Sequence, residues 1–178
     1  MKVAIFIDAA HLSKVEQENG ININYEKLGD ELTKGDYRVR TYFYDARANR
    51  SDLDSKEEQE LDYKKETFLC ALDRFPRFEV KLGRLQKIMG KWIQKGVDMR
   101  LGVDMVQMSA NKQIDKAILI AADGDFVYSI MKAKEAGVVT ILVSFPNDII
   151  NRDLRKAVDE VIELDNAFIE KCRFNRGN

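Results

Sequence analysis

The chain has 178 residues, of which 45% are hydrophobic and 33% are charged, and its formal net charge at pH 7 is −1. This length and composition suit one globular domain with its own core and exclude a disordered chain. One histidine and two cysteines argue against a His/Cys zinc site, and the near-zero charge means that nucleic-acid binding would have to rest on local basic patches.

Two strands and two helices are predicted in the first quarter of the chain. Residues 2–7, KVAIFI, are apolar and rich in β-formers, which predicts a strand buried on both faces of a sheet. Asp8 ends this run, and helices are predicted to follow over 9–18 and 25–34. The segment 37–45 alternates in side-chain character and then contains several aromatic residues, which predicts the second strand.

A loop, a helix and a hairpin are predicted next. The polar segment 46–55 predicts a mobile loop. Ser55 and Glu58 have the spacing of a capping box, which predicts a helix over 56–72. Basic and apolar side chains alternate over 77–94 with a period closer to that of a strand than to that of a helix, which predicts a β-hairpin.

The second half of the chain alternates helices with short apolar strands. In chain order these are a helix over 97–110, a strand over 116–121, a helix over 124–136, a strand over 138–144, a helix over 148–157, a strand over 160–164 and a helix over 165–172. Such alternation indicates βαβ units, whose right-handed crossovers cover both faces of a mainly parallel sheet. We therefore predict a three-layer α/β/α fold in a single domain over 1–172, with 173–178 as a C-terminal tail.

Three aspartates stand where predicted buried strands end. Asp8 follows the first strand directly. Asp123 and Asp125 follow another, and Gly124 between them lets the backbone turn so that both side chains can face one cleft. Ligands of open parallel sheets bind beyond the carboxyl ends of the strands, so these carboxylates are predicted to share a site. Capping of the next helix is the alternative role for each aspartate taken alone.

Two further aspartates lie on the predicted helix 97–110. Asp98, at its start, is a candidate metal ligand, with helix capping as the alternative. Asp104 stands about 120° around the helix from Asp98, so the two side chains cannot both point squarely into one cleft. We therefore assign Asp104 a supporting role, as the partner of a basic side chain or of a metal ligand.

Together, four aspartates predict a divalent-metal site. Clustered carboxylates repel one another and are tolerated where a divalent cation neutralises them. Mg²⁺ or Mn²⁺ is suited to a few carboxylates plus water and a substrate phosphate, and such an ion activates water for attack on phosphorus. The residues predicted to hold the ion and carry catalysis are Asp8, Asp123 and Asp125, with Asp98 as the candidate fourth.

Several motifs of the chain resemble those of the NYN/LabA-like branch of the PIN-domain nuclease superfamily. They are Phe6-Ile7-Asp8, Lys95-Gly96-Val97-Asp98 with Asp104, Ala122-Asp123-Gly124-Asp125-Phe126, Val143-Ser144, Asp153-Leu154 and Val161-Ile162-Glu163-Leu164. The resemblance implies a Rossmann-like PIN fold and metal-dependent cleavage of RNA. It also implies Mg²⁺ or Mn²⁺ as cofactor, with the same four aspartates as metal ligands.

The run Asp8-Ala9-Ala10-His11 departs from the family pattern, which usually carries asparagine three residues after the first aspartate. His11 is a candidate for a contact to substrate or to metal-bound water. The alternative is that it is a partly exposed residue of the first helical turn without a role in the site. The departure motivates an alternative function, a catalytically altered NYN domain that acts as an RNA- or protein-binding regulator. A haloacid-dehalogenase-type phosphatase is disfavoured because it needs an aspartate where Ala10 stands.

Other polar residues are candidates for substrate contacts. Lys95 is tied to Asp98 by sequence, and Ser144 ends a predicted strand near the cleft, with a strand-end turn as its alternative role. A basic surface on the predicted hairpin would position phosphates, and its aromatic residue would stack on a base. The alternative is a solvated face with the aromatic side chain in the core or at a dimer contact. The residues of this surface are Lys81, Arg84, Lys87, Lys91, Trp92 and Lys95.

RNA is the expected partner, and a homodimer is a further possibility. Apolar runs are only a few residues long, far below the roughly 20 residues needed to span a bilayer, so no membrane span is predicted. The two cysteines, Cys70 and Cys172, lie far apart and do not form a disulfide framework, which favours a reducing cytoplasm.

Overall fold

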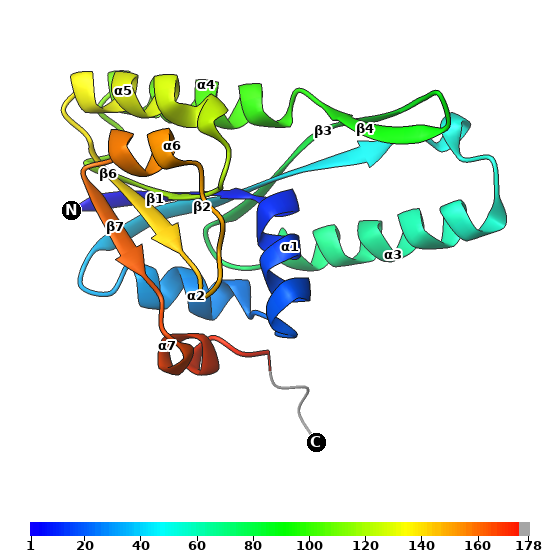
Figure 1. The fold of residues 1–178 in the computed structure, drawn as a ribbon, viewed down its shortest axis with the longest axis horizontal. Helices are drawn as coiled ribbons and strands as arrows, with labels where there is room; N and C mark the ends of the chain where they lie inside the picture. The colour runs from blue at the N-terminus through cyan, green and yellow to red at the C-terminus, as the bar shows by residue number, and fades with distance from the viewer. Residues whose placement is uncertain (175–178) are drawn as a thin grey trace.

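The computed structural model describes residues 1–174 and shows an α/β architecture built on a seven-stranded sheet (Figure 1). The strand order is β4-β3-β2-β1-β5-β6-β7, and neighbouring strands are parallel except for the antiparallel pair β3 and β4. The strands are β1 (Lys2–Asp8), β2 (Tyr37–Ala48), β3 (Phe78–Ile88), β4 (Lys91–Lys95), β5 (Lys116–Ile120), β6 (Val139–Ser144) and β7 (Glu160–Glu163).

The helices cover the two faces of the sheet in separate sets, which confirms the predicted three-layer α/β/α fold. One face carries α1 (Ala9–Asn19), α2 (Tyr25–Leu32), α3 (Lys56–Leu72) and α7 (Asn166–Lys171). The other face carries α4 (Val97–Ala110), α5 (Val127–Glu135) and α6 (Arg152–Ala157). Two short 3₁₀ helices, η1 (Arg50–Asp52) and η2 (Gly124–Phe126), lie in the connections.

The central strand β1 shows how the sequence builds a core on both faces. Successive side chains of a strand point to opposite faces, so Val3, Ile5 and Ile7 enter the core under α1 and α3. Ala4 and Phe6 enter the core under α4. All five are at most 1% exposed. Full burial of each larger side chain contributes about 1.5–3 kcal/mol, which is why a continuous apolar run occupies this position.

Parallel pairing places the carboxyl ends of β1 and β5 side by side. Ile7 of β1 pairs with Ile120 of β5, one residue before Asp8 and three before Asp123. The chain therefore leaves both strands at the same edge of the sheet. Aspartates that are far apart in sequence become neighbours for this reason alone.

An arm extends from the body of the molecule at the same side (Figure 1). We define the arm as the β3–β4 hairpin, the end of β2 and helix α3. The hairpin turns at Met89 and Gly90, which both have positive φ. Gly83 lets the chain that leaves the hairpin lie close over β3, because a Cβ at Gly83 would be 2.7 Å from the carbonyl oxygen of Lys95 and from Cγ2 of Val97. This close crossing sets where α4 begins.

The predicted mobile loop over 46–55 is wrong in its first part. Strand β2 continues to Ala48 and pairs with β3 as far as Leu85. Arg47 therefore belongs to a strand, and its guanidinium donates to the carboxylates of Asp62 and Glu66 on α3 at 2.7–3.0 Å. These partners are far away in sequence, so the local polar composition could not reveal them.

Two helix starts also differ from the prediction. The segment 124–126 forms a 3₁₀ turn before α5 rather than part of one continuous helix. The segment 148–151 is not helical, and α6 begins only at Arg152. The side chain of Asn151 accepts hydrogen bonds from the backbone N–H groups of Asp153 and Leu154, so Asn151 is the residue that starts the helix.

The first two residues of the predicted C-terminal tail contact the body. Arg173 pairs with Ile23 in an isolated antiparallel bridge, and the N–H of Phe174 donates to the carbonyl of Asn22 at 2.8 Å. The rest of the predicted tail, 175–178, lies outside the described residues. Within residues 1–174, no helix is both long and apolar enough to cross a bilayer.

Candidate metal centre

The four predicted aspartates all lie at helix starts. Asp8 is the N-cap of α1, and its carboxylate accepts from the N–H of Ala10 at 3.0 Å. Asp123 is the N-cap of η2 and accepts from the N–H of Asp125 at 3.0 Å. Asp98 lies in the first turn of α4. Helix N-termini carry partial positive charge, so all four positions favour an anionic side chain.

Two glycines bring the start of α4 to this edge of the sheet. Gly96 precedes the helix with φ +78°, a backbone conformation that residues other than glycine rarely adopt. This conformation turns the chain out of β4 into α4. Gly102 lets α4 pack closely against α5, because a Cβ there would lie 2.4 Å from Oγ of Ser129. Asp98 on α4 and Asp125 before α5 line a shared groove with these residues.

The charges of the four aspartates interact. Burial raises the pKa of Asp8, and the nearby charge of Asp98 raises it further. Partial burial raises the pKa of Asp98, and the charges of Asp123 and Asp125 add to this effect. We call Asp8, Asp98, Asp123 and Asp125 the acidic cluster. Within residues 1–174, none of its members forms an ion pair with a basic side chain, so its mutual repulsion is not neutralised by the protein.

The donor chemistry of the acidic cluster fits a hard divalent cation. Carboxylate oxygens are the ligands that Mg²⁺ and Mn²⁺ prefer, and burial together with neighbouring carboxylates raises the pKa values of Asp8 and Asp98, both of which a cation would offset. The arrangement is open, however. Over the described part of the chain, no three His, Cys, Asp or Glu side chains are close enough together to hold an ion. The side chains would have to rotate inward for three of them to share one.

Asp104 lies apart from the acidic cluster, on another side of α4. Its Oδ2 accepts from the hydroxyl of Tyr44 at 2.9 Å and from Nζ of Lys81 at 2.8 Å. The neighbouring carboxylate and burial together raise the pKa of Tyr44, with burial the larger cause. Asp104 thus has a basic partner, one of the two roles predicted for it from its helical phase.

His11 is buried, which excludes the alternative role as a partly exposed residue of the first helical turn. Only 7% of the residue is exposed, because the first turn of α1 packs beneath the loop that follows β6. Its Nε2 lies 3.2 Å from Oδ2 of Asp148, although the direction of approach leaves Nε2 without a hydrogen bond to any described residue. The charge of His11 also lowers the pKa of Asp8, against the larger effect of burial. His11 therefore links the start of α1 to a loop far along the chain.

Ser144 and Lys95 have different surroundings. Ser144, at the end of β6, is 3% exposed, and its Oγ accepts from Nη2 of Arg155 at 3.2 Å. Lys95 ends β4, is exposed and has no ion pair with any residue between 1 and 174. It pairs across the hairpin with Arg84, which is also exposed and without an ion pair in that range. Two cations opposite each other destabilise a hairpin unless an anion lies between them.

The rest of the predicted basic surface is divided. Lys81 pairs with Asp104, and Nζ of Lys87 lies 2.7 Å from Asp54 and 3.0 Å from Glu58. Trp92 also donates to Glu58, at 3.3 Å. The contacts with Glu58 hold the hairpin against α3, whereas Lys81 joins β3 to α4. The free cations that remain on the hairpin are Arg84, Lys91 and Lys95, judged over the described residues alone.

Asn151 is a polar neighbour of the cluster that sequence reasoning missed. Its backbone N–H donates to the carbonyl of Ala122 at 2.9 Å. Its side-chain amide lies 2.8 Å from where a Cβ on Gly124 would be, so glycine is needed for this contact. The sequence signal was an asparagine capable of capping a helix, but the predicted helix start at 148 concealed it.

Comparisons with known proteins identify the family of the chain and a structure with a similar fold. The family described as NYN domain matches residues 2–165, which is most of the chain. NYN domains belong to the PIN-like nuclease superfamily. The crystal structure of a protein of unknown function from Vibrio parahaemolyticus has a TM-score of 0.65 and 18% identity, and the alignment covers 94% of this chain and 95% of that one. A likeness at that identity shows the fold alone. No curated protein matches the chain.

Proposed function

The chain belongs to the NYN-domain family, and on that premise we propose that it is a metal-dependent ribonuclease. The family as a whole indicates a nuclease-like, RNA-related function, and PIN-like nucleases generally use divalent metals. The observation that carries the proposal is the acidic cluster. Asp8 and Asp98 have raised pKa values and no basic partner in the described chain, at an edge where ligands of parallel sheets bind.

The acidic cluster would hold Mg²⁺ or Mn²⁺ through its carboxylates. Such an ion, when bound, supplies an activated water and offsets the charge that develops on the phosphorus oxygens. The exposed pair Arg84 and Lys95 would bind the phosphates of the RNA backbone close to the start of α4. The Lys95–Asp98 and Asp123–Phe126 motifs further support a place in the LabA-like branch of the family.

A cleavage assay with matched variants tests the proposal. Purified protein is incubated with end-labelled single-stranded and structured RNA in Mn²⁺, in Mg²⁺ and in chelator. We expect cleavage that needs the metal and falls by at least about 100-fold in Asp8→Asn, Asp98→Asn and Asp123→Asn.

Asp165→Asn is the matched control. Asp165 caps α7 as Asp8 caps α1, accepting from Phe168 N–H at 2.7 Å, but it lies on the other side of the molecule from α4 (Figure 1). The Asp165 variant is expected to cleave as the wild type does. No cleavage by the wild type, or equal cleavage by the Asp8 and Asp123 variants, would exclude the ribonuclease.

A second candidate is a catalytically altered NYN domain that binds RNA or protein without cutting. The placement of His11 against Asp148 favours it, because a buried histidine stands where the family usually carries asparagine. This candidate predicts RNA affinity that survives chelator and no turnover in any metal tested.

A further inference from the structure

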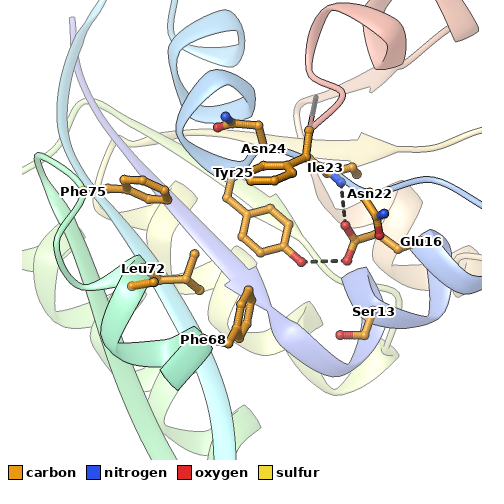
Figure 2. Close-up of a pocket in the computed structure, with 11 residues that line it drawn as sticks. Ser13, Glu16, Asn22, Ile23, Asn24, Tyr25, Phe68, Leu72 and Phe75 are labelled. Carbon is orange, nitrogen blue, oxygen red and sulfur yellow. Dashed lines mark hydrogen bonds between the residues drawn. The ribbon is translucent and has the colours of Figure 1, made fainter. Parts of the chain in front are cut away.

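A cavity separate from the acidic cluster opens between α1, α2 and α3 (Figure 2). Its volume is about 440 Å³, within the range of roughly 300–1,000 Å³ typical of small-molecule sites. Ser13 and Glu16 line it from α1, Tyr25 from α2, and Phe68 and Leu72 from α3. None of these residues is used by the proposed metal site.

Four aromatic side chains line the cavity. Figure 2 shows the Tyr25 ring near the centre, with Phe75 to its left and Phe68 below it. Tyr25 and Phe68 meet edge to face with ring centroids 6.0 Å apart. Phe68 is 41% exposed and Phe174, also in the lining, is 52% exposed. Flat aromatic faces left open to solvent at the mouth of a cavity are suited to stacking a planar ring.

One end of the cavity is polar and accepts hydrogen bonds. The carboxylate of Glu16 accepts from the N–H of Ile23 through Oε1 and from the hydroxyl of Tyr25 through Oε2, both at 2.7 Å. These bonds fix the direction of the carboxylate, as Figure 2 shows. Each oxygen keeps a further lone pair, and Glu16 has no cationic partner within residues 1–174. Burial raises the pKa of Glu16, so the carboxylate gains from any additional donor.

The two hydrogen bonds of Glu16 hold residues 23–25 in place, which is a structural role. This role does not account for the open space and the exposed aromatic rings beside the carboxylate. A purely structural carboxylate needs neither an open space in front of it nor exposed rings beside it. The side chains of Ser13 and Asn22 add further polar groups to the same wall. Aromatic faces with a fixed acceptor at one edge match a planar ring that carries N–H donors on its rim.

Helix α1 connects this cavity to the acidic cluster. Asp8 caps the helix, and Glu16 lies eight residues later, about 12 Å along the axis. Between them, Ser13 lies three residues before Glu16 on the same side of the helix and is exposed. The cavity and the acidic cluster therefore lie at two points along one helix.

We propose that this cavity binds a nucleobase with two adjacent N–H donors, so that guanine is preferred over the other three bases. The two carboxylate oxygens of Glu16 accept from N1–H and from the N2 amino group of guanine, while Phe68 stacks on the ring. Adenine and cytosine present one donor beside an acceptor, and uracil presents one N–H between two carbonyls. The preference for guanine does not depend on the proposed ribonuclease activity. The inference that the guanine belongs to an RNA strand rests on that proposed function.

Nucleosides in chelator test the cavity without the metal site. Guanosine, adenosine, cytidine and uridine are titrated into the full chain in EDTA and followed by calorimetry or amide chemical shifts. We expect saturable binding with guanosine at least about tenfold tighter than uridine. No saturation by any nucleoside, or equal affinity for guanosine and uridine, would overturn the proposal. Tighter binding of tetramethylammonium than of guanosine would overturn it as well.

Three variants locate the binding. Glu16→Gln turns an amide N–H₂ toward the guanine donors and is expected to weaken guanosine about tenfold while sparing uridine. Phe68→Ala removes the stacking face and is expected to weaken all four nucleosides about tenfold. Tyr128→Ala, at a 67% exposed aromatic residue on α5, is the matched control and should bind as the wild type. Unchanged guanosine affinity in Phe68→Ala would overturn the site even if Glu16→Gln fails to fold.

Short RNAs distinguish the source of the base. A uridine nonamer with one central guanine is compared with the all-uridine nonamer and with guanosine 5′-monophosphate, again in EDTA. Tighter binding of the guanine-containing nonamer than of the mononucleotide identifies a strand, and the reverse identifies a free nucleotide. Because no step of this test requires cleavage, base binding without nuclease activity would refute the ribonuclease alone. Metal-dependent cleavage without base preference would refute the cavity alone.

Discussion

Carboxylates of the arm and carboxylates of the acidic cluster have opposite electrostatic environments. In the arm, hydrogen bonds from Arg47 lower the pKa of Asp62, and those from Lys87 lower the pKa of Glu58. In the acidic cluster, burial and neighbouring carboxylates raise the pKa of Asp98. The same type of side chain thus stabilises the fold in one region and opposes it in the other.

This difference distinguishes carboxylates that stabilise the fold from carboxylates that are available to a ligand. The ion pairs of the arm join β2 and the hairpin to α3, so their carboxylates are already satisfied. The acidic cluster has no such partner in residues 1–174, and a protein retains repulsive charge mainly where a ligand relieves it.

The largest expected effect is stabilisation by metal. Mn²⁺ at about 100 times its Kd should raise the free energy of unfolding by about 2.7 kcal/mol, because it binds the folded chain and not the unfolded one. The measurement is urea unfolding at pH 7 with and without Mn²⁺. The double variant Asp8→Asn/Asp123→Asn should lose the effect, and Asp165→Asn should keep it. Equal stabilisation of the double variant would place the metal elsewhere.

The next largest effect is expected in the arm. Arg47→Ala removes the partner of two carboxylates and should lower the free energy of unfolding by about 1–2 kcal/mol. The neighbouring Arg50 is the control, because its side chain is 80% exposed and its contact with Glu66 is longer, at 3.3 Å. Arg50→Ala should change stability by less than about 0.5 kcal/mol. Similar losses in both variants would show that the arm does not depend on the Arg47 pairs.

Neutralising one aspartate should have opposite effects in the two regions. Asp98→Asn removes repulsion and is expected to raise the free energy of unfolding by about 0.5 kcal/mol, a small gain because the side chain reaches solvent. Asp62→Asn removes an attraction and is expected to lower it by about 1 kcal/mol. Urea unfolding in metal-free buffer gives both values. Destabilisation by Asp98→Asn would contradict the repulsive cluster.

The smallest expected effect is the dependence on pH of the changes that Asp98→Asn and Asp62→Asn make to the free energy of unfolding. The pKa of Asp62 is lowered in the folded chain, so its stabilisation is present above the unfolded value of about 3.9 and is lost as pH falls through the folded pKa. The pKa of Asp98 is raised, so its cost to stability appears as pH rises from the unfolded value through the folded one. The advantage of Asp98→Asn at pH 7 should therefore vanish near pH 4, whereas the deficit of Asp62→Asn should persist there.

Features that depend on neighbours in sequence were predictable. The capping box of Ser55 and Glu58 is present as predicted, and α3 spans the predicted residues. Asp8 and Asp123 were placed at strand ends because an apolar run and its last residue lie next to each other in the chain. The match of motifs around Asp98 and Asp123 led to the NYN family, which the comparison confirms.

Features that depend on distant partners were not predictable. Arg47 was assigned to a loop because its carboxylate partners lie on another element. The burial of His11 was not predictable either, because the loop that covers it lies near position 148. The cavity beside Glu16 gave no sequence signal, because its walls come from three helices whose packing alone brings them together.

The sequence by itself thus determined the alternation of strands and helices, the family and the acidic residues at strand ends. These follow from local periodicity, capping and the direction of parallel strands. Only the tertiary structure decided which charges are neutralised. Asp104 and Asp62 acquire cations from other elements, whereas Asp8 and Asp98 acquire carboxylates as neighbours. The energy of a charge depends on what surrounds it in space, and folding sets those surroundings.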